Sequence, residues 1–220
     1  MAIVKTNWQS FLYPDSDLPP DVTFLVKSED DESQSKSFWA HRLFLGGISP
    51  VFRGMFFGPM KETGEVVEVK ETTPEAFSTM INFIYMSPEE SFNLDNITSC
   101  PQKLFELLAL ADRYQILDLK TLATEALSNL ALTRENMIFT ATVAKHYKPA
   151  FEDVSTRLMV KCLKFLYDTT TGVGDIGALI RETEQSFPGA SLDILRELIS
   201  AGNETLQLPG ICNLMFVGLI

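Results

Sequence analysis

The fold is decided by three stretches of sequence: DVTFLV at residues 21–26, FWAHRLFL at residues 38–45 and SPVFRGMF at residues 49–56. The first is dense in β-branched and aromatic side chains, and it follows Pro19-Pro20, where a helix cannot enter. It therefore predicts a strand. A polar, partly acidic segment separates this strand from a short apolar run at residues 38–40, so we expect a second strand beyond a solvated loop.

A single helix is expected over residues 41–57, and it is apolar on nearly all sides. One stripe of this helix contains His41, Leu45, Ile48 and Phe52, and the remaining circumference contains Leu43, Phe44, Gly47, Val51 and Met55. A helix of this kind must be covered on two sides. In a small domain the second cover is often another subunit, and Gly46 with Gly47 would allow close backbone approach there.

The later sequence predicts one more strand and then helices. The strand is expected at residues 65–69, and Thr73 caps the next helix with Pro74 at its first position. Ser99 and Gln102 form a capping-box pattern before another helix. Further helices are expected over residues 118–130, 136–147 and 151–165, and after Ser191. This order predicts an α+β domain with a small sheet of short strands flanked by helices, followed by an all-helical extension.

Composition excludes several classes of partner. The chain has 29 acidic and 18 basic residues, a formal net charge of −11, which disfavours nucleic acid and anionic membranes. Cys100, Cys162 and Cys212 lack the spacing of a zinc site and are interpreted as buried thiols, without metal. The first residues contain no long apolar stretch and the apolar tail at 209–220 is too short for a bilayer, so we expect cytoplasmic or nuclear localisation and no membrane segment.

No catalytic arrangement is recognisable, so we expect a protein without enzymatic activity or cofactor. The two histidines, His41 and His146, do not lie in a nucleophile motif, and His41 is interpreted as a structural residue after a strand. Residues 172–177 match GxGxxG, but no convincing strand precedes them and Asp175 would repel a phosphate. They are interpreted as a loop.

The motifs that remain resemble a BTB/POZ domain. Besides the three stretches quoted first, the matching blocks are residues 65–69, 74–86 and 108–114. The resemblance covers residues 21–130, after an N-terminal segment at 1–20. Residues 131–208 resemble more weakly the helical BACK region of many cullin adaptors, and the apolar tail follows. Gly46-Gly47 replaces an alanine-rich pair, which leaves the details of dimer packing open.

The resemblance implies a homodimer that recruits other proteins. It places the dimer interface at Leu43, Phe44, Gly47 and Val51. In the subset that binds a cullin-3 scaffold, a hydrophobic-any-Glu motif follows the dimer helix, and Met60-Lys61-Glu62 occupies that position here. We expect Met60, Glu62, Asp112 and Tyr114 to contact cullin-3, for ubiquitylation of an unknown protein substrate. A solvated turn after Gly58-Pro59 is the alternative interpretation of residues 60–62.

Two other subsets of the family remain possible. In transcriptional scaffolds the dimer binds a corepressor peptide beside a charged pocket, which the resemblance places at Asp21 and Arg42. Such proteins usually also carry zinc fingers, and none is recognisable here. Tetramerisation modules of channels lack the helical extension. A kelch, MATH or zinc-finger receptor module is not recognisable in these 220 residues either, so the adaptor interpretation leaves the substrate-binding part unassigned.

Overall fold

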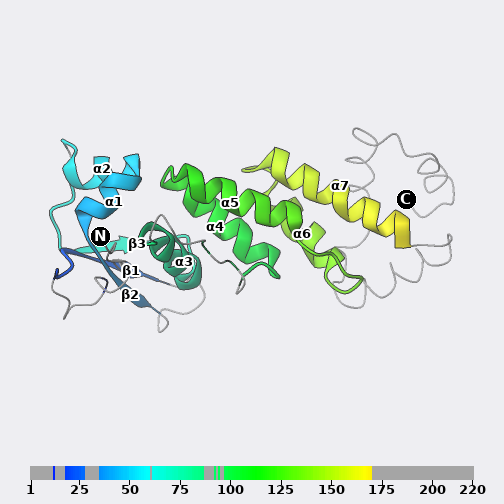
Figure 1. Ribbon diagram of the computed structural model, residues 1–220, viewed down its shortest axis with the longest axis horizontal. Coiled ribbons are helices and arrows are strands. Elements are labelled where there is room, and N and C mark those ends of the chain that lie inside the picture. Colours follow the sequence, from blue (N-terminus) through cyan, green and yellow to red (C-terminus); the bar gives the residue numbers. More distant parts are fainter. Residues whose placement is uncertain are drawn as a thin grey trace, which may run out of the picture. The chain divides into compact units, whose positions relative to one another are not determined.

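A three-stranded sheet forms the base of the first part of the chain (Figure 1). The computed structural model describes residues 12, 18–27, 35–59, 61–86, 92, 94 and 97–169. The strands are β1 (Val22–Val26), β2 (Lys36–Ala40) and β3 (Val66–Val69), in the order β2-β1-β3. β1 is antiparallel to β2, with Val22 opposite Ala40, and parallel to β3, with Thr23 opposite Val66. The three predicted strands are confirmed.

One face of this sheet carries the aromatic core. Alternate residues of β1 are buried, as the period of a strand requires, and Phe24 is fully enclosed at its centre. The Phe24 ring lies 5.7 Å from the ring of Phe52 and 5.2 Å from that of Phe77. Helices on this face therefore pack directly onto the central strand.

The single helix expected over residues 41–57 is wrong. The structure has two helices, α1 (Arg42–Ile48) and α2 (Pro50–Phe57), separated by Ser49 in extended conformation with φ −112° and ψ 123°. Proline lacks the N–H that would continue the helix and disfavours helical geometry in the residue before it. The Ser49 hydroxyl instead accepts a hydrogen bond from the Phe52 N–H at 3.1 Å and so caps α2.

Three further helices follow β3: α3 (Pro74–Ile84), α4 (Pro101–Arg113) and α5 (Leu117–Asn129). The predicted cap of α3 is confirmed, since the Thr73 hydroxyl accepts from the Ala76 N–H at 3.3 Å. The capping box expected at Ser99 is wrong. Pro101 occupies the first turn of α4, which moves the cap to Cys100, and the Gln102 amide donates to Glu106 instead.

The chain divides into two compact units, residues 1–126 and 127–220. In the second, the end of α5 precedes α6 (Met137–Tyr147) and α7 (Glu152–Thr169). Thr133 and Asn136 exchange hydrogen bonds before α6: Thr133 N–H donates to the Asn136 amide oxygen at 2.8 Å, and Asn136 N–H donates to the Thr133 hydroxyl at 3.2 Å. α6 and α7 pack together, and both contribute buried apolar side chains to this unit, among them Ala141, Ala144, Leu158, Met159 and Cys162.

Several sequence-based predictions lie outside the described residues. These are the acidic part of the loop before β2, Met60, Cys212, the GxGxxG match, the helix after Ser191 and the apolar tail. Of the helices that are described, none has the length and apolar character that a membrane crossing demands. The α+β domain followed by a helical extension is confirmed.

Candidate functional site

A buried hydrogen-bond network joins the end of β2 to the end of α3. The His41 N–H donates to the Tyr85 hydroxyl at 2.7 Å, and His41 Nδ1 lies 2.8 Å from the same hydroxyl. His41 Nε2 lies 3.0 Å from the Leu18 carbonyl oxygen. A carbonyl can only accept, so Nε2 carries the proton and Nδ1 accepts from the Tyr85 O–H. Burial raises the pKa of Tyr85, which keeps its proton available. Both nitrogens of His41 are therefore occupied, as a structural histidine requires.

The surface of α1 and α2 exposes several large apolar side chains. Leu43 is 75% exposed, Ile48 44% and Phe57 56%. Of the other predicted dimer residues, Gly47 is exposed, whereas Phe44 and Val51 are half-buried. The Phe44 ring stacks on Tyr85 at 5.2 Å, so it connects the surface to the buried network. Exposed apolar residues gathered on one helix pair are typical of a protein contact.

The two adjacent glycines of α1 have different reasons for lacking a side chain. A Cβ on Gly46 would lie 2.8 Å from Cε2 of Phe57, so Gly46 is needed for the Phe57 ring to rest on α1. A Cβ on Gly47 would meet nothing within 4 Å. Glycine inside a helix costs about 1 kcal/mol relative to alanine. Packing within the described residues does not explain Gly47, whereas close approach of another molecule would.

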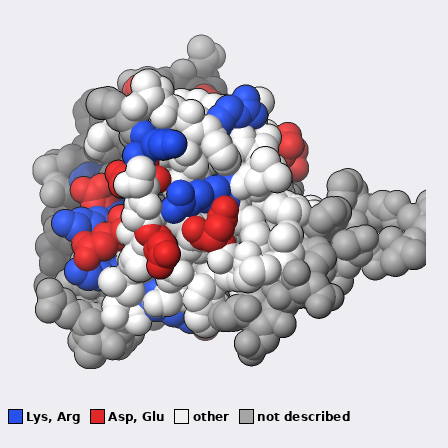
Figure 2. Space-filling model, turned by 90° about the vertical axis from the view of Figure 1, so that its left-hand side faces the viewer, with Lys and Arg blue, Asp and Glu red and all other residues white. Residues whose placement is uncertain are grey.

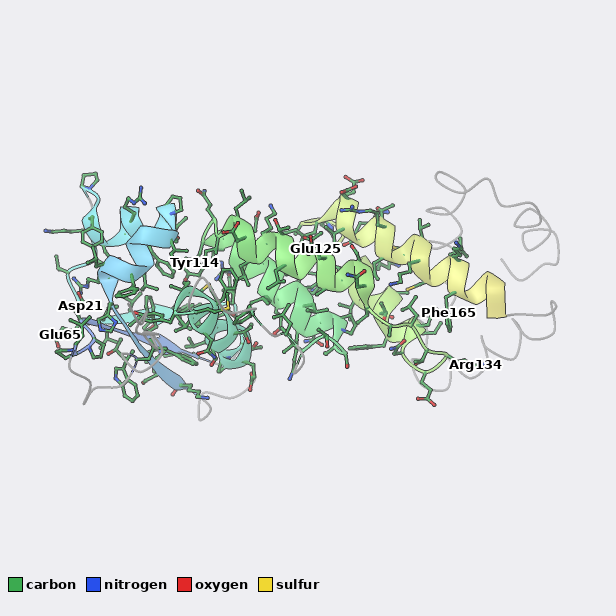
Figure 3. All side chains as sticks on the ribbon, in the orientation of Figure 1. Asp21, Glu65, Tyr114, Glu125, Arg134 and Phe165 are labelled. Atoms are coloured by element: carbon green, nitrogen blue, oxygen red, sulfur yellow. The ribbon has the colours of Figure 1, made fainter. Side chains whose placement is uncertain are left out.

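Asp21 and Arg42, predicted to form a charged pocket, are neighbours without being an ion pair. The Asp21 carboxylate accepts from the Arg42 backbone N–H at 2.8 Å. The Arg42 guanidinium donates to the Gly64 carbonyl oxygen at 2.8 Å and lies over the Phe56 ring, 5.4 Å from its centroid. Figure 3 shows Asp21 beside Glu65 at the same end of the first unit. Here the Asp21 carboxylate caps the start of α1.

Of the four residues expected to contact cullin-3, the three that the structure describes lie in different environments. Glu62 is exposed, and its N–H donates to the Met55 carbonyl oxygen at 2.8 Å, which turns the chain back after α2. Asp112 is also exposed and pairs with Lys120 at 2.5 Å. Tyr114 is only 5% exposed, because its ring stacks on Phe52 with centroids 4.2 Å apart. Glu62 and Asp112 can meet a partner, whereas the Tyr114 ring belongs to the core.

Sequence reasoning missed the residues that hold this surface in place. The Ser49 hydroxyl donates to the Tyr114 carbonyl oxygen at 2.5 Å and so fastens the break between α1 and α2 to the end of α4. Arg53 Nε donates to the Gly46 carbonyl oxygen at 2.9 Å and so satisfies the end of α1. The Ser49-Pro50 pair could have indicated the break between the two helices, since serine followed by proline is typical of the start of a helix.

Charge on this end of the first unit is mixed. Figure 2 shows Lys and Arg interspersed with Asp and Glu, beside an area without charged side chains. No patch of a single sign is visible in that view among the described residues. No group of three or more His, Cys, Asp or Glu side chains in the described ranges is arranged to hold a metal ion. The surface is therefore suited to contacts with protein that combine apolar area and individual charges.

Known proteins resemble both parts of the chain. A BTB/POZ domain model matches residues 14–130. "BTB/POZ and MATH domain-containing protein 3" of Arabidopsis thaliana is 27% identical over 197 residues, which are 85% of this chain and 44% of that protein. "TD and POZ domain-containing protein 4" of Mus musculus is 36% identical over 108 residues, 49% of this chain and 27% of that protein.

The chain thus spans less than half the length of these relatives. Among solved structures, the BTB domain of zebrafish PATZ1 is similar at a TM-score of 0.35 and 22% identity, covering 48% of this chain and 73% of that one. The match over residues 14–130 takes in the whole sheet and helices α1 to α5. By this match, the chain belongs to the BTB/POZ domain family.

Proposed function

We propose that this chain is a homodimeric adaptor that docks a cullin-3 scaffold and presents a protein substrate for ubiquitylation. BTB/POZ domains are protein-interaction modules. The observation that carries the proposal is the exposed surface of α1 and α2, with Leu43 and Gly47 on α1, followed in the chain by the Met60-Lys61-Glu62 motif.

The dimer is expected to form through α1. Leu43 has no cover within the described residues, although burying a leucine contributes about 1.5–3 kcal/mol. Gly47 leaves room beside it for the backbone of a second α1. Ile48 extends the same apolar surface. A self-complementary contact of this kind is what a two-fold dimer requires.

The cullin is expected to dock at the segment after α2. Glu62 is exposed, and a hydrogen bond from its N–H to the Met55 carbonyl oxygen holds its backbone in place. The position from which its carboxylate extends into solvent is therefore fixed. Asp112 supplies a second exposed carboxylate at the end of α4. The similarity to a BTB/POZ and MATH protein extends over 197 residues, beyond the BTB domain, which supports a helical extension of the adaptor type. An adaptor of this class would act in the cytoplasm or nucleus.

The corepressor-binding alternative receives less support. It would use Asp21 and Arg42 as a charged pocket, but the Asp21 carboxylate is already bonded to the backbone of α1 and the Arg42 guanidinium to Gly64. A peptide would have to replace both hydrogen bonds.

Calorimetry with the amino-terminal domain of cullin-3 tests the docking proposal. We expect the wild-type chain to bind, and Met60→Ala and Glu62→Lys each to weaken binding by about tenfold or more, because they remove the apolar anchor and reverse the charge. Glu65→Lys is the matched control, since it makes the same charge change at an exposed residue outside the motif. No wild-type binding at roughly 50 µM protein would contradict docking. Equal losses for Glu62→Lys and Glu65→Lys would contradict the assigned motif.

A further inference from the structure

We propose that the groove between the end of α5 and α7 binds an acidic peptide segment that carries an aliphatic side chain. The groove has a volume of about 320 Å³ and is lined by Leu127, Ser128, Val154, Arg157, Leu158 and Lys161. All six belong to the second unit, and none belongs to the dimer surface or the cullin motif described above.

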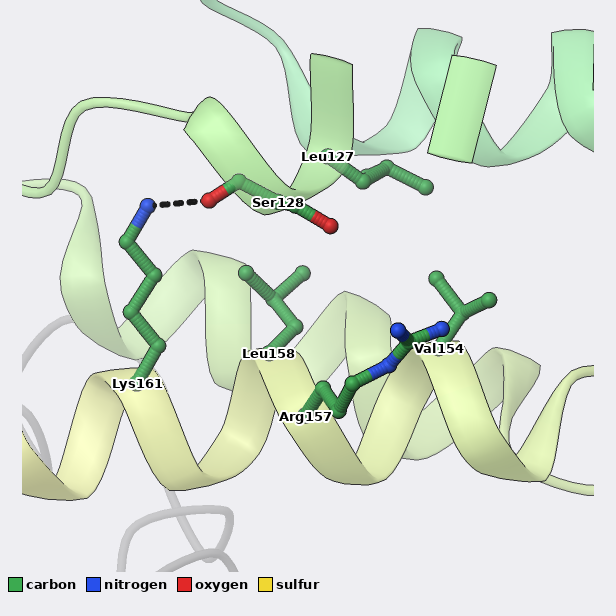
Figure 4. Close-up of a pocket in the computed structure, with 6 residues that line it drawn as sticks. All are labelled: Leu127, Ser128, Val154, Arg157, Leu158 and Lys161. Atoms are coloured by element: carbon green, nitrogen blue, oxygen red, sulfur yellow. Dashed lines mark hydrogen bonds between the residues drawn. The ribbon is translucent and has the colours of Figure 1, made fainter. Parts of the chain in front are cut away.

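The floor of the groove is apolar. Leu127 and Leu158 are buried, and Val154 is half-buried beside them. Figure 4 shows Leu127 of α5 facing Leu158 and Val154 of α7 across the opening. The volume is sufficient for one leucine-sized side chain with part of its backbone. Because Leu127 and Leu158 are only 0% and 3% exposed, the apolar part of the binding free energy would come from the ligand side chain itself and from covering Val154.

The rim of the groove is cationic. Two of its lining residues, Arg157 and Lys161, lie one helical turn apart on α7, and no acidic residue lies between them. Residues 117–169, which span α5 to α7, contain seven basic and six acidic residues, whereas the complete chain has a net charge of −11. The groove therefore lies in a nearly neutral part of an acidic protein, and its two lining cations, Arg157 and Lys161, favour an acidic occupant by charge complementarity.

Lys161 is positioned to receive a carboxylate. Its ammonium group donates to the Ser128 carbonyl oxygen at 2.6 Å and to the Leu130 carbonyl oxygen at 2.8 Å, which fixes it at the end of α5. An ammonium group has three N–H donors, so one remains for a ligand. Figure 4 shows this side chain reaching Ser128 on one side of Leu158, with Arg157 on the other.

Arg157 is able to exchange its present partner for a ligand. Its guanidinium lies 2.8 Å from the Asp153 carboxylate, but these side chains are 58% and 85% exposed. An exposed pair one helical turn apart contributes little, so a competing carboxylate can replace Asp153 at small cost. Two cations on either side of an apolar floor predict a ligand with an aliphatic residue between acidic residues.

Fluorescence anisotropy with the full chain and a labelled Glu-Asp-Leu-Glu-Asp peptide tests this assignment. We expect saturable binding with Kd below about 1 mM, weakened about tenfold by Arg157→Glu and by Val154→Phe, which fills the groove at constant charge. Lys103→Glu on α4 is the matched control, because it makes the same charge change at an exposed lysine of the first unit. Circular dichroism of each variant establishes that it is folded.

Replacing the peptide leucine by glycine should also weaken binding about tenfold, since the floor loses its occupant. Phosphatidylserine vesicles distinguish a peptide site from an anionic membrane surface. Binding to vesicles but not to the peptide would overturn the proposal, and so would equal peptide affinity in Arg157→Glu and Lys103→Glu. The result is independent of cullin docking, because Met60→Ala and Glu62→Lys should leave peptide affinity unchanged.

Discussion

At the scale of single residues, the molecule depends on a few buried polar side chains with assigned partners. His41, Ser49 and Tyr85 lie almost out of reach of solvent, where an unpaired polar group is costly. His41 and Tyr85 hydrogen-bond to each other. The Ser49 hydroxyl accepts from the Phe52 N–H at the start of α2 and donates to the Tyr114 carbonyl oxygen. These bonds fix the base of α1, which carries the proposed dimer surface.

Tyr85→Phe tests the buried network. It leaves both the His41 N–H and Nδ1 without their partner, so we expect a loss of about 1–3 kcal/mol in the free energy of unfolding, measured by urea denaturation. Tyr114→Phe is the control, since the described hydrogen bond of that residue uses its carbonyl oxygen and its ring stacking is retained. Equal losses for the two variants would mean that the His41 network contributes nothing beyond tyrosine burial.

Cys162 provides a test at alkaline pH. Burial raises the pKa of its thiol from 9.0 to about 12. Above pH 9 the unfolded thiol ionises while the folded one stays protonated, so stability present below pH 9 falls as the pH rises toward 12. Burial also raises the pKa of Tyr85, which acts in the same direction.

We therefore expect the free energy of unfolding to decrease between about pH 8 and pH 10.5, and to decrease less steeply in Cys162→Ala. Urea denaturation at the two pH values, in the presence of reductant, measures both slopes. Identical slopes for the two proteins would contradict a thiol that stays protonated in the folded state.

At the scale of elements, the break between α1 and α2 decides what the surface presents. Ser49 in extended conformation ends one helix and caps the next, so the apolar residues expected around one long helix are divided between two short ones. Leu45, Phe52 and Phe56 turn into the core, while Leu43, Ile48 and Phe57 remain exposed. One helix pair thus supplies both part of the core and an exposed apolar surface.

Ser49→Ala removes this cap and its bond to the Tyr114 carbonyl oxygen. We expect it to reduce the free energy of unfolding by about 1–3 kcal/mol, because a helix start and a buried carbonyl both lose a partner. Ser78→Ala on α3 is the matched control and should change stability by less than about 0.5 kcal/mol. Thermal unfolding followed by circular dichroism compares the two. A neutral Ser49→Ala would contradict the role assigned to this hydroxyl.

The sequence was sufficient for elements whose signals are local. The strand at residues 22–26 and the Thr73 cap of α3 follow from side-chain type and spacing alone, and both are confirmed. The sequence-based predictions were wrong where the apolar periodicity or a capping pattern conflicted with a nearby proline. The apolar period runs through residues 41–57, but Ser49-Pro50 interrupts the backbone, and Pro101 likewise outweighed the Ser99 pattern.

The candidate site was predictable only in part. The apolar excess of α1 predicted exposed residues such as Leu43, but burial of a given side chain depends on contacts far away in sequence. Tyr114 meets Phe52, 62 positions earlier, and so lies in the core. The groove between α5 and α7 also depends on such contacts, since Lys161 reaches carbonyl oxygens more than 30 residues before it. Spacing along one helix gives no information about such partners.

At the scale of the whole molecule, the chain presents several surfaces that can contact other proteins. The BTB domain carries an exposed apolar helix pair and an exposed Glu62, and the second unit carries a separate groove with cations at its rim. We propose that these surfaces bind different partners: a second copy, a cullin and an acidic peptide.

The most direct test of this account is sedimentation velocity of the chain mixed with the amino-terminal domain of cullin-3. We predict a complex of two chains and two cullin domains for the wild type and for Leu117→Asp, and one of each for Leu43→Asp. Leu117 and Leu43 are 74% and 75% exposed. The two substitutions therefore add a charge at equally exposed leucines, and only Leu43 lies on the proposed dimer surface. A wild-type chain that stays monomeric at high concentration, or a Leu43→Asp variant that still dimerises, would contradict the account.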